Sequence, residues 1–184
     1  MNILATVSFF VGTILIIYIS RRSLLHPRSH GFFRFFAWEG ILFLIILNAP
    51  YWIDNPRSAS QIISWILLTV SIYPVVHGVF LLQVVGKPTD TADKGSDLAF
   101  EKTTILITSG IYRYIRHPLY ASLIYLTWGV YFKNSTWMTT VISLGISLFL
   151  LETAKAEEKE NAIHFGKRYT EYAGRTKMFI PYIW

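Results

Sequence analysis

Long apolar runs separated by short polar stretches dominate the pattern of this 184-residue chain. A helix needs about 20 mostly apolar residues to cross the hydrocarbon core of a bilayer. Three runs reach that length and two shorter ones follow: 2–20, 35–53, 61–85, 117–132 and 136–151. The two shorter runs are separated only by 133–135, which predicts a tight helical hairpin. The pattern therefore predicts an all-α integral membrane protein with five transmembrane helices.

Basic residues are distributed unequally between the two sets of loops that five spans create. Segments 21–34, 86–116 and the part after 151 fall on one side and hold every Lys and Arg except Arg57 and Lys133. Cytoplasmic loops carry an excess of Lys and Arg. We therefore predict that the N-terminus lies outside and the C-terminus inside. The net charge of +6 then follows from topology and needs no nucleic-acid partner.

The composition agrees with a membrane protein and excludes several kinds of chemistry. Apolar residues make up 53% and charged residues 15%, against a usual charged share of about 25%. Because cysteine is absent, disulfides, thiolate metal sites and a cysteine nucleophile are excluded. No P-loop, Rossmann fingerprint or H-E-x-x-H motif is present. The first run lacks a basic start and a small-residue cleavage site, so we expect a retained span.

Polar residues that could take part in catalysis or binding are concentrated in the second half of the chain. We predict one domain over 1–184, with a three-span bundle in 1–85 and a catalytic core in 86–184. The longest polar stretch lies in 86–109 and is expected to cover a site. The predicted topology places these polar residues on the cytoplasmic side.

The stretch GIYRYIRHPLY, residues 110–120, combines a helix start with positive charge. Proline is favoured in the first turn of a helix, so we expect a helix from Pro118 with His117 near its cap. A helix N-terminus suits an anionic group, and Arg113 and Arg116 add cations. The alternative is that these side chains only anchor a span at the lipid headgroups.

Two adjacent carboxylates, Glu157 and Glu158, follow the last apolar run. On a helix Glu158 continues the apolar stripe of the span and should be partly buried, whereas Glu157 lies on a polar line with Thr153 and Asn161. The alternative is that both glutamates are ordinary solvent-exposed charges where the helix leaves the membrane.

Ionisable residues inside membrane spans are functional candidates. Glu39 lies in the second run near the basic loop, and we expect it to extend to the interface. His77, four residues after Tyr73, is expected to make a polar pair across a helix interface. Neither residue is accompanied by other metal-ligating side chains at a suitable spacing in the sequence, so we predict no metal site.

The stretches 109–120 and 157–181 together resemble the isoprenylcysteine carboxyl methyltransferase family. The central motif of that family is similar to Ser109-Gly110-Ile111-Tyr112, Arg116-His117-Pro118 and Tyr120. Its C-terminal motif is similar to Glu157-Glu158, Phe165-Gly166, Tyr169, Tyr172 and Pro181. The resemblance covers about residues 100–184. Phospholipid N-methyltransferases belong to the wider superfamily, and membrane sterol reductases share the Arg-His-Pro-x-Tyr feature.

The resemblance implies a membrane methyltransferase that uses S-adenosylmethionine and acts on a lipophilic substrate from the bilayer. The implied cofactor contacts are Thr104, Ile105, Leu106, Ile107, Tyr112, His117, Pro118, Leu119, Tyr120 and Glu157. Arg116 and Glu158 are the candidate catalytic residues. Arg116 would orient the acceptor carboxylate, with Arg168 and Arg175 as alternatives. Five spans suggest a compact prokaryotic relative, in the cell membrane with its site facing the cytoplasm.

Two positions depart from the family pattern and leave the acceptor open. Thr153 stands where eukaryotic members have an arginine on the substrate side, and Asn161 stands where a leucine is expected. The primary expectation is methylation of an isoprenylcysteine-like carboxylate. The alternatives are a phospholipid N-methyltransferase, an NADPH-dependent reductase using Lys167, Arg168, Arg175 and Lys177 for phosphate, and a small transporter or scaffold. Transporters usually show an internal repeat, and none is visible.

Overall fold

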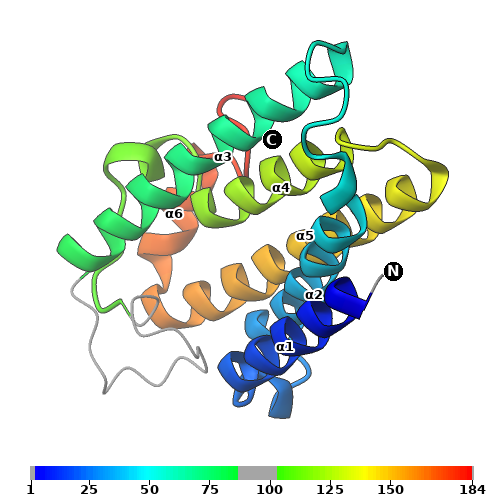
Figure 1. The fold of residues 1–184 in the computed structure, drawn as a ribbon. Coiled ribbons are helices and arrows are strands. Elements are labelled where there is room, and N and C mark those ends of the chain that lie inside the picture. Colours follow the sequence, from blue (N-terminus) through cyan, green and yellow to red (C-terminus); the bar gives the residue numbers. More distant parts are fainter. Residues whose placement is uncertain (1–2, 87–102, 184) are drawn as a thin grey trace.

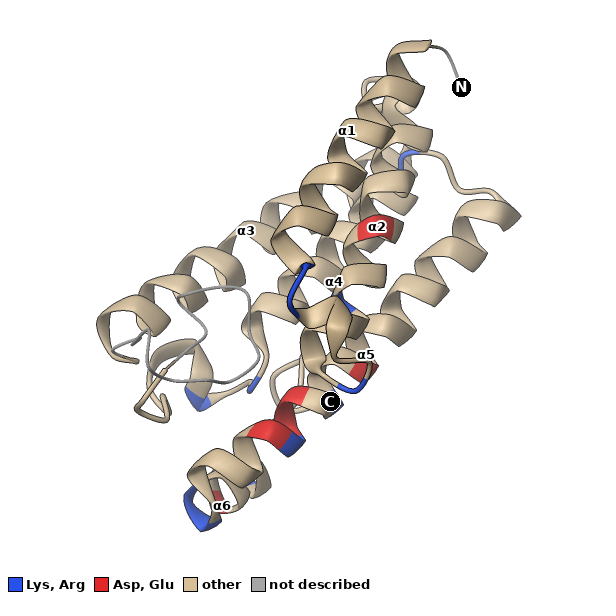
Figure 2. Cartoon of the chain, turned by 90° about the horizontal axis from the view of Figure 1, so that it is seen from below, with Lys and Arg blue, Asp and Glu red and all other residues tan. Residues whose placement is uncertain are grey.

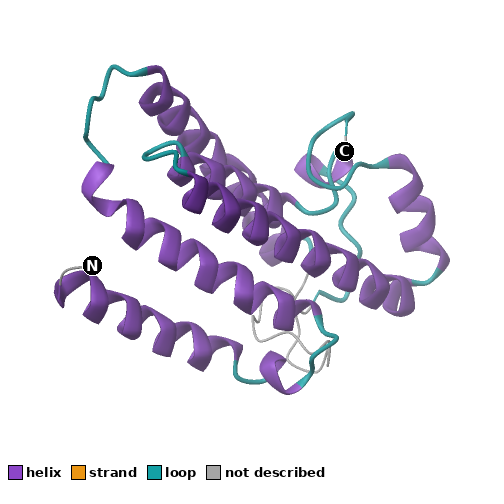
Figure 3. Ribbon diagram, turned by 90° about the vertical axis from the view of Figure 1, so that its right-hand side faces the viewer, coloured by secondary structure: helices purple, strands orange, loops and turns teal. Residues whose placement is uncertain are grey.

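The computed structural model describes residues 3–86 and 103–183, and helices dominate both ranges (Figures 1 and 3). The α-helices are α1 (Ile3–Ser20), α2 (His30–Asn48), α3 (Ala59–Val84), α4 (Pro118–Tyr131), α5 (Trp137–Phe165) and α6 (Lys167–Arg175). Short 3₁₀ turns occupy Ser23–Leu25, Ala49–Tyr51 and Gly110–Arg113. Within the described ranges no strand forms, and the only β pairing is an isolated bridge between Ile115 and Lys177. The predicted all-α class is confirmed.

Four helices of the described residues are long and apolar enough to cross a membrane: α1, α2 with its short extension to Tyr51, α3 and α5. Their middle parts carry few charged residues, which gather instead in the turns, at the end of α5 and in α6 (Figure 2). The fourth predicted span is α4, which has 14 residues. At about 1.5 Å per residue it is about 21 Å long, shorter than a hydrocarbon core of about 30 Å. A fifth full span therefore stays a prediction.

The helices form two groups that meet at α4 and α5. α3 packs along α4, α2 packs along α5, and α1 packs on α2, while α4 contacts α5 (Figure 1). Among the described residues α3 has its main contacts with α4 rather than with α1 or α2. The division into a three-span bundle (1–85) and a catalytic core (86–184) stays a prediction. Apolar runs predict that helices enter a membrane, but lipid tails are as apolar as leucine, so the runs do not specify neighbours. Packing and buried polar contacts select them.

Polar contacts fix the end of α4 against α2 and α3. Ser64 on α3 donates to the carbonyl of Gly129 at 2.6 Å, and Asn48 on α2 donates to the carbonyl of Val130 at 2.8 Å. A Cβ at Gly129 would lie 2.9 Å from the Leu68 side chain and 3.1 Å from its backbone nitrogen. Glycine is required here because the two helices approach so closely.

Lys133, in the predicted hairpin between α4 and α5, is buried rather than solvated. Its Nζ donates to Oε1 of Gln61 at 2.9 Å and to the carbonyl of Trp52 at 3.3 Å. The ammonium also lies 3.7 Å from the ring centroid of Trp65. The hairpin is thus held to the start of α3 by one cation.

The two intramembrane ionisable residues do not behave as predicted. Glu39 accepts a hydrogen bond from Thr13 on α1 at 2.9 Å, and its other carboxyl oxygen is buried without a partner among the described residues. It therefore ties α1 to α2 and does not extend to the interface. His77 stacks on Tyr73 of its own helix, with ring centroids 5.4 Å apart. Its buried Nε2 makes no hydrogen bond within the described ranges.

Candidate cofactor site

The chain enters the site through the tight turn Gly110–Arg113. Gly110 has φ +58°, and a Cβ there would lie 2.6 Å from Leu81 and 2.7 Å from the ring of His77. The left-handed conformation and the close approach both require glycine. The turn buries Ile111 and Tyr112 and directs the chain toward the start of α4.

The C-terminal segment pairs with the chain just ahead of α4. The backbone N–H of Arg116 donates to the carbonyl of Lys177 at 2.8 Å, and that of His117 donates to Met178 at 3.1 Å. The hydroxyl of Tyr172 on α6 donates to the carbonyl of Tyr112 at 2.7 Å. These contacts bring two segments about 60 residues apart into one wall.

His117 lies at the start of α4, as predicted, and faces two of the carboxylates of α5, those of Glu157 and Glu158. Nδ1 of His117 is 3.6 Å from Oε2 of Glu157, and Nε2 is 3.3 Å from Oε1 of Glu158. The imidazole is 2% exposed and stacks on Tyr120, with centroids 5.5 Å apart. Because adjacent helical residues point in different directions, the two carboxylates reach the two ring nitrogens separately.

The electrostatics of this cluster favour a protonated His117. Burial alone would lower the pKa of the imidazole, but hydrogen bonds and charge from Glu157 and Glu158 outweigh it and raise the pKa above the ordinary value. When it is protonated, the buried ring of His117 is a cation between two anions. A neutral side chain would leave both carboxylates facing one another across the ring.

Arg116 is engaged with the protein itself. Its Nε donates to Oε1 of Glu158 at 2.6 Å, and its Nη1 donates to the carbonyls of Ala173, at 3.0 Å, and Thr176. The guanidinium thereby joins α5 to the end of α6. This is a structural role that the sequence did not reveal; orientation of an acceptor by Arg116 stays a prediction.

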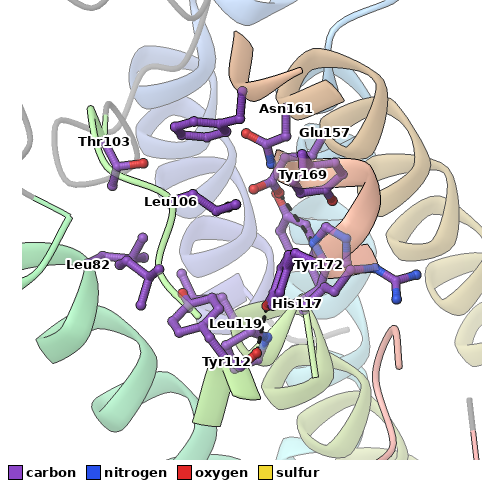
Figure 4. Close-up of a pocket in the computed structure, with 15 residues that line it drawn as sticks. Leu82, Thr103, Leu106, Tyr112, His117, Leu119, Glu157, Asn161, Tyr169 and Tyr172 are labelled. Carbon is purple, nitrogen blue, oxygen red and sulfur yellow. Dashed lines mark hydrogen bonds and ion pairs between the residues drawn. The ribbon is translucent and has the colours of Figure 1, made fainter. Parts of the chain in front are cut away.

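A pocket lies between the start of α4, the end of α5, α6 and the end of α3 (Figure 4). It encloses about 660 Å³ when its open mouth is included. Of the predicted cofactor contacts it is lined by Leu106, Ile107, Tyr112, His117, Pro118, Leu119, Tyr120 and Glu157, and also by Arg116. Thr104, Ile105 and Glu158 do not line it. The part of the predicted covering segment within 87–102 lies outside the described residues.

Several lining residues were absent from the predicted site. They are Leu82, Thr103, Asn161, Phe165, Tyr169 and Tyr172. Tyr169 and Tyr172 are three residues apart and share the buried face of the short α6, a pattern visible in the sequence. Leu82 could not be found from sequence, because only the packing of α3 on α4 brings it there.

Tyr169 presents a hydrogen-bonding group that the protein leaves unused. Its hydroxyl is buried and has no partner among the described residues. Burial first, and then the charges of Glu158 and Glu157, raise the pKa of Tyr169 far above its ordinary value. The phenol is therefore neutral and able to donate. A buried polar group without a partner is costly, so a ligand that accepts this hydrogen bond would be stabilised.

Comparison with protein families gives a match in the second half of the chain. Residues 95–164 match the model of the isoprenylcysteine carboxyl methyltransferase (ICMT) family. Comparison with curated proteins and with solved structures gave no match. The matched range includes the turn ahead of α4, His117, Glu157 and Glu158, and it leaves α1–α3 outside. The second half of the chain is thus similar to the isoprenylcysteine carboxyl methyltransferase family over residues 95–164, and the described residues of this range supply most of the pocket lining.

Proposed function

We propose that this protein is an S-adenosylmethionine-dependent membrane methyltransferase that acts on a lipophilic acceptor. The observation that carries the proposal is the pocket in which Glu157 and Tyr169 lie beside the start of α4. The family match supports a membrane methyltransferase of the isoprenylcysteine type. The apolar helices α1, α2, α3 and α5 support its location in a membrane.

The residues of the pocket fit the chemical groups of the cofactor. Glu157 is an anion suited to the amino group, and the first N–H groups of α4 have no intrahelical acceptor and suit the carboxylate. The unpartnered hydroxyl of Tyr169 and the amide of Asn161 are polar groups for the ribose. The apolar side chains of Leu106 and Leu119 suit the adenine ring.

The chemistry that the cofactor supplies is an electrophilic methyl group on a positively charged sulfur. A carboxylate acceptor is already ionised at neutral pH, so the protein needs no strong general base. Its contribution is to position the reactants and exclude water. His117, Glu157 and Glu158 contribute to positioning, because their mutual contacts fix the start of α4 and the two carboxylates in one arrangement.

The acceptor we propose is the carboxylate of an isoprenylcysteine-like molecule that enters from the bilayer. Thr153 is fully buried and donates to the carbonyl of Phe149 at 2.7 Å, so its side chain is not directed into the pocket. The arginine of eukaryotic members therefore has no replacement at this position. We further propose that the pocket faces the cytoplasm, which the distribution of basic residues favours.

The NADPH-dependent reductase receives less support from the geometry. It would need cations beside the pocket to hold a phosphate. Arg168 and Arg175 instead line a separate hollow together with Arg113. Lys167 is almost fully exposed and lies 3.8 Å from Glu171.

Calorimetric binding of S-adenosylhomocysteine and of NADPH to the detergent-purified protein tests the cofactor. We expect micromolar binding of S-adenosylhomocysteine that is lost in Glu157→Ala and weakened about fivefold or more in Tyr169→Phe. Glu152→Ala is an exposed control on the same helix as Glu157. Binding of NADPH with no binding of S-adenosylhomocysteine would overturn the proposal.

A second assay tests the acceptor. The protein is incubated with S-adenosylmethionine labelled in the methyl group and either a farnesylcysteine derivative with a free carboxylate or its carboxamide. We expect label only in the acid, released as volatile methanol by mild base, because a methyl ester hydrolyses and an N-methyl group does not. Base-stable label in phosphatidylethanolamine would identify the N-methyltransferase alternative.

A further inference from the structure

A groove separate from the cofactor pocket runs along the outer face of α3 and α4. Its walls are mostly apolar or aromatic and include Val70, Tyr73, Pro74, Ile115, Tyr125 and Pro181. Val70 is 45% exposed and Tyr73 is 62% exposed, so this face is not covered by another part of the described chain. Its residues are distinct from those that line the cofactor pocket.

A basic hollow lies beside the groove, at the end of α6. Three guanidinium groups line it, from Arg113, Arg168 and Arg175. The carboxylate of Glu171 also lines it, so positive charge is in excess. None of the ion pairs found within the described residues involves these three arginines. An exposed cluster of arginines without carboxylate partners is suited to a phosphate group.

Arg113 lines both the groove and the basic hollow, so the two are adjacent. From His77 the groove follows α3 to Val70, a distance of about 10 Å at 1.5 Å per residue. It thus begins at the charged end of the helices and continues along an apolar surface that α3 would present to lipid. At its charged end the buried Nε2 of His77 lacks a partner among the described residues.

We propose that the groove and the basic hollow together form a binding site for one anionic phospholipid. The phosphate lies against Arg113, Arg168 and Arg175, and an acyl chain occupies the groove between α3 and α4. A free phosphate would make no use of the apolar walls, and phosphatidylcholine would bring a trimethylammonium group beside the three arginines. The combination of excess positive charge and adjacent apolar surface favours the anionic lipid.

Native mass spectrometry of the detergent-purified protein tests the site, with phosphatidylglycerol, phosphatidylcholine of the same acyl chains, and inorganic phosphate as probes. We expect phosphatidylglycerol to bind at least about tenfold more tightly than phosphatidylcholine. Arg168→Gln and Arg175→Gln should each weaken it about fivefold, as expected for the loss of one basic residue near an anionic lipid. Arg28→Gln, an exposed arginine between α1 and α2, is the matched control and should change nothing.

The groove is tested separately by filling it. Val70→Trp should weaken phosphatidylglycerol binding, while Val76→Trp, exposed on another face of α3, should not. Equal binding of the two lipids, or unchanged affinity in both arginine variants, would overturn the proposal. Phosphate binding as tight as that of the lipid, with no effect of Val70→Trp, would show a free-anion site and would also overturn it. None of these outcomes depends on the proposed methyltransferase activity.

Discussion

Nε2 of His117 lies 3.3 Å from Oε1 of Glu158, although the two residues are 41 positions apart in the sequence. The same carboxyl oxygen accepts a hydrogen bond from Nε of Arg116 at 2.6 Å. Glu158 therefore holds the helix start at Pro118 and the end of α6 against α5. Glu157, its neighbour, faces the pocket from the other side of the imidazole. One carboxylate thus supports the wall, and the other is available to a ligand.

The His117 cluster predicts that stability decreases as pH rises. Because the pKa of His117 is raised above its ordinary value of 6.5, the protonated ring stabilises the folded state. This contribution is complete below pH 6.5 and is lost as pH rises through the higher folded pKa. We expect the Tm in detergent to fall from pH 6.5 to pH 9 more steeply in the wild type than in His117→Gln. The exposed control His26→Gln should keep the wild-type slope; equal slopes in all three would contradict the assignment.

The two carboxylates predict a separation of stability from binding. Glu158→Gln leaves Arg116 without its carboxylate partner and His117 with Glu157 alone, and we expect the free energy of unfolding to fall by about 1–3 kcal/mol. Glu157→Gln should instead weaken S-adenosylhomocysteine about tenfold, or about 1.4 kcal/mol. Thermal unfolding and calorimetry on both variants measure the two effects. The reverse pattern would show that Glu158 contacts the ligand and Glu157 supports the wall.

Tyr169 and Tyr172 form a matched pair that also separates an effect on stability from an effect on ligand binding. Tyr172→Phe loses the hydrogen bond to the carbonyl of Tyr112, which should cost about 1 kcal/mol of stability. Tyr169→Phe loses no hydrogen bond within the described residues, so its Tm should not fall. Its affinity for S-adenosylhomocysteine should fall about fivefold or more, for the loss of one hydrogen bond of about 1 kcal/mol. Unchanged affinity in Tyr169→Phe would show that the hydroxyl does not bind the cofactor.

Lys133 predicts a purely structural effect at the opposite end of the helices. Lys133→Met removes the ammonium from the ring of Trp65 and leaves the amide oxygen of Gln61 without its donor. We expect the free energy of unfolding to decrease by about 2–3 kcal/mol, with unchanged S-adenosylhomocysteine affinity. Arg57→Met, in an exposed turn, is the control. A change in cofactor affinity would indicate that this end of α4 communicates with the pocket.

The sequence by itself determined the helices and the order of the motifs. Apolar runs of spanning length predicted α1, α2 and α3, a shorter run predicted the first part of α5, and Pro118 predicted the start of α4. Length, hydrophobicity and proline act locally along the chain, so the sequence alone reveals them. The spacing within 109–120 and 157–172 also indicated the family, which the match over 95–164 confirmed. The faces of a helix predicted that Glu157 and Glu158 would point to different sides.

Tertiary structure alone decided which helices meet and which polar groups are used. The apolar runs did not show that α3 pairs with α4 and α2 with α5, since membrane helices are selected by close packing and buried hydrogen bonds rather than by hydrophobicity. No spacing showed that Arg116 binds the end of α6, that Glu39 accepts from Thr13, or that the hydroxyl of Tyr169 is left without a partner. Each of these depends on contacts between residues far apart in the sequence, so only the folded chain could reveal them.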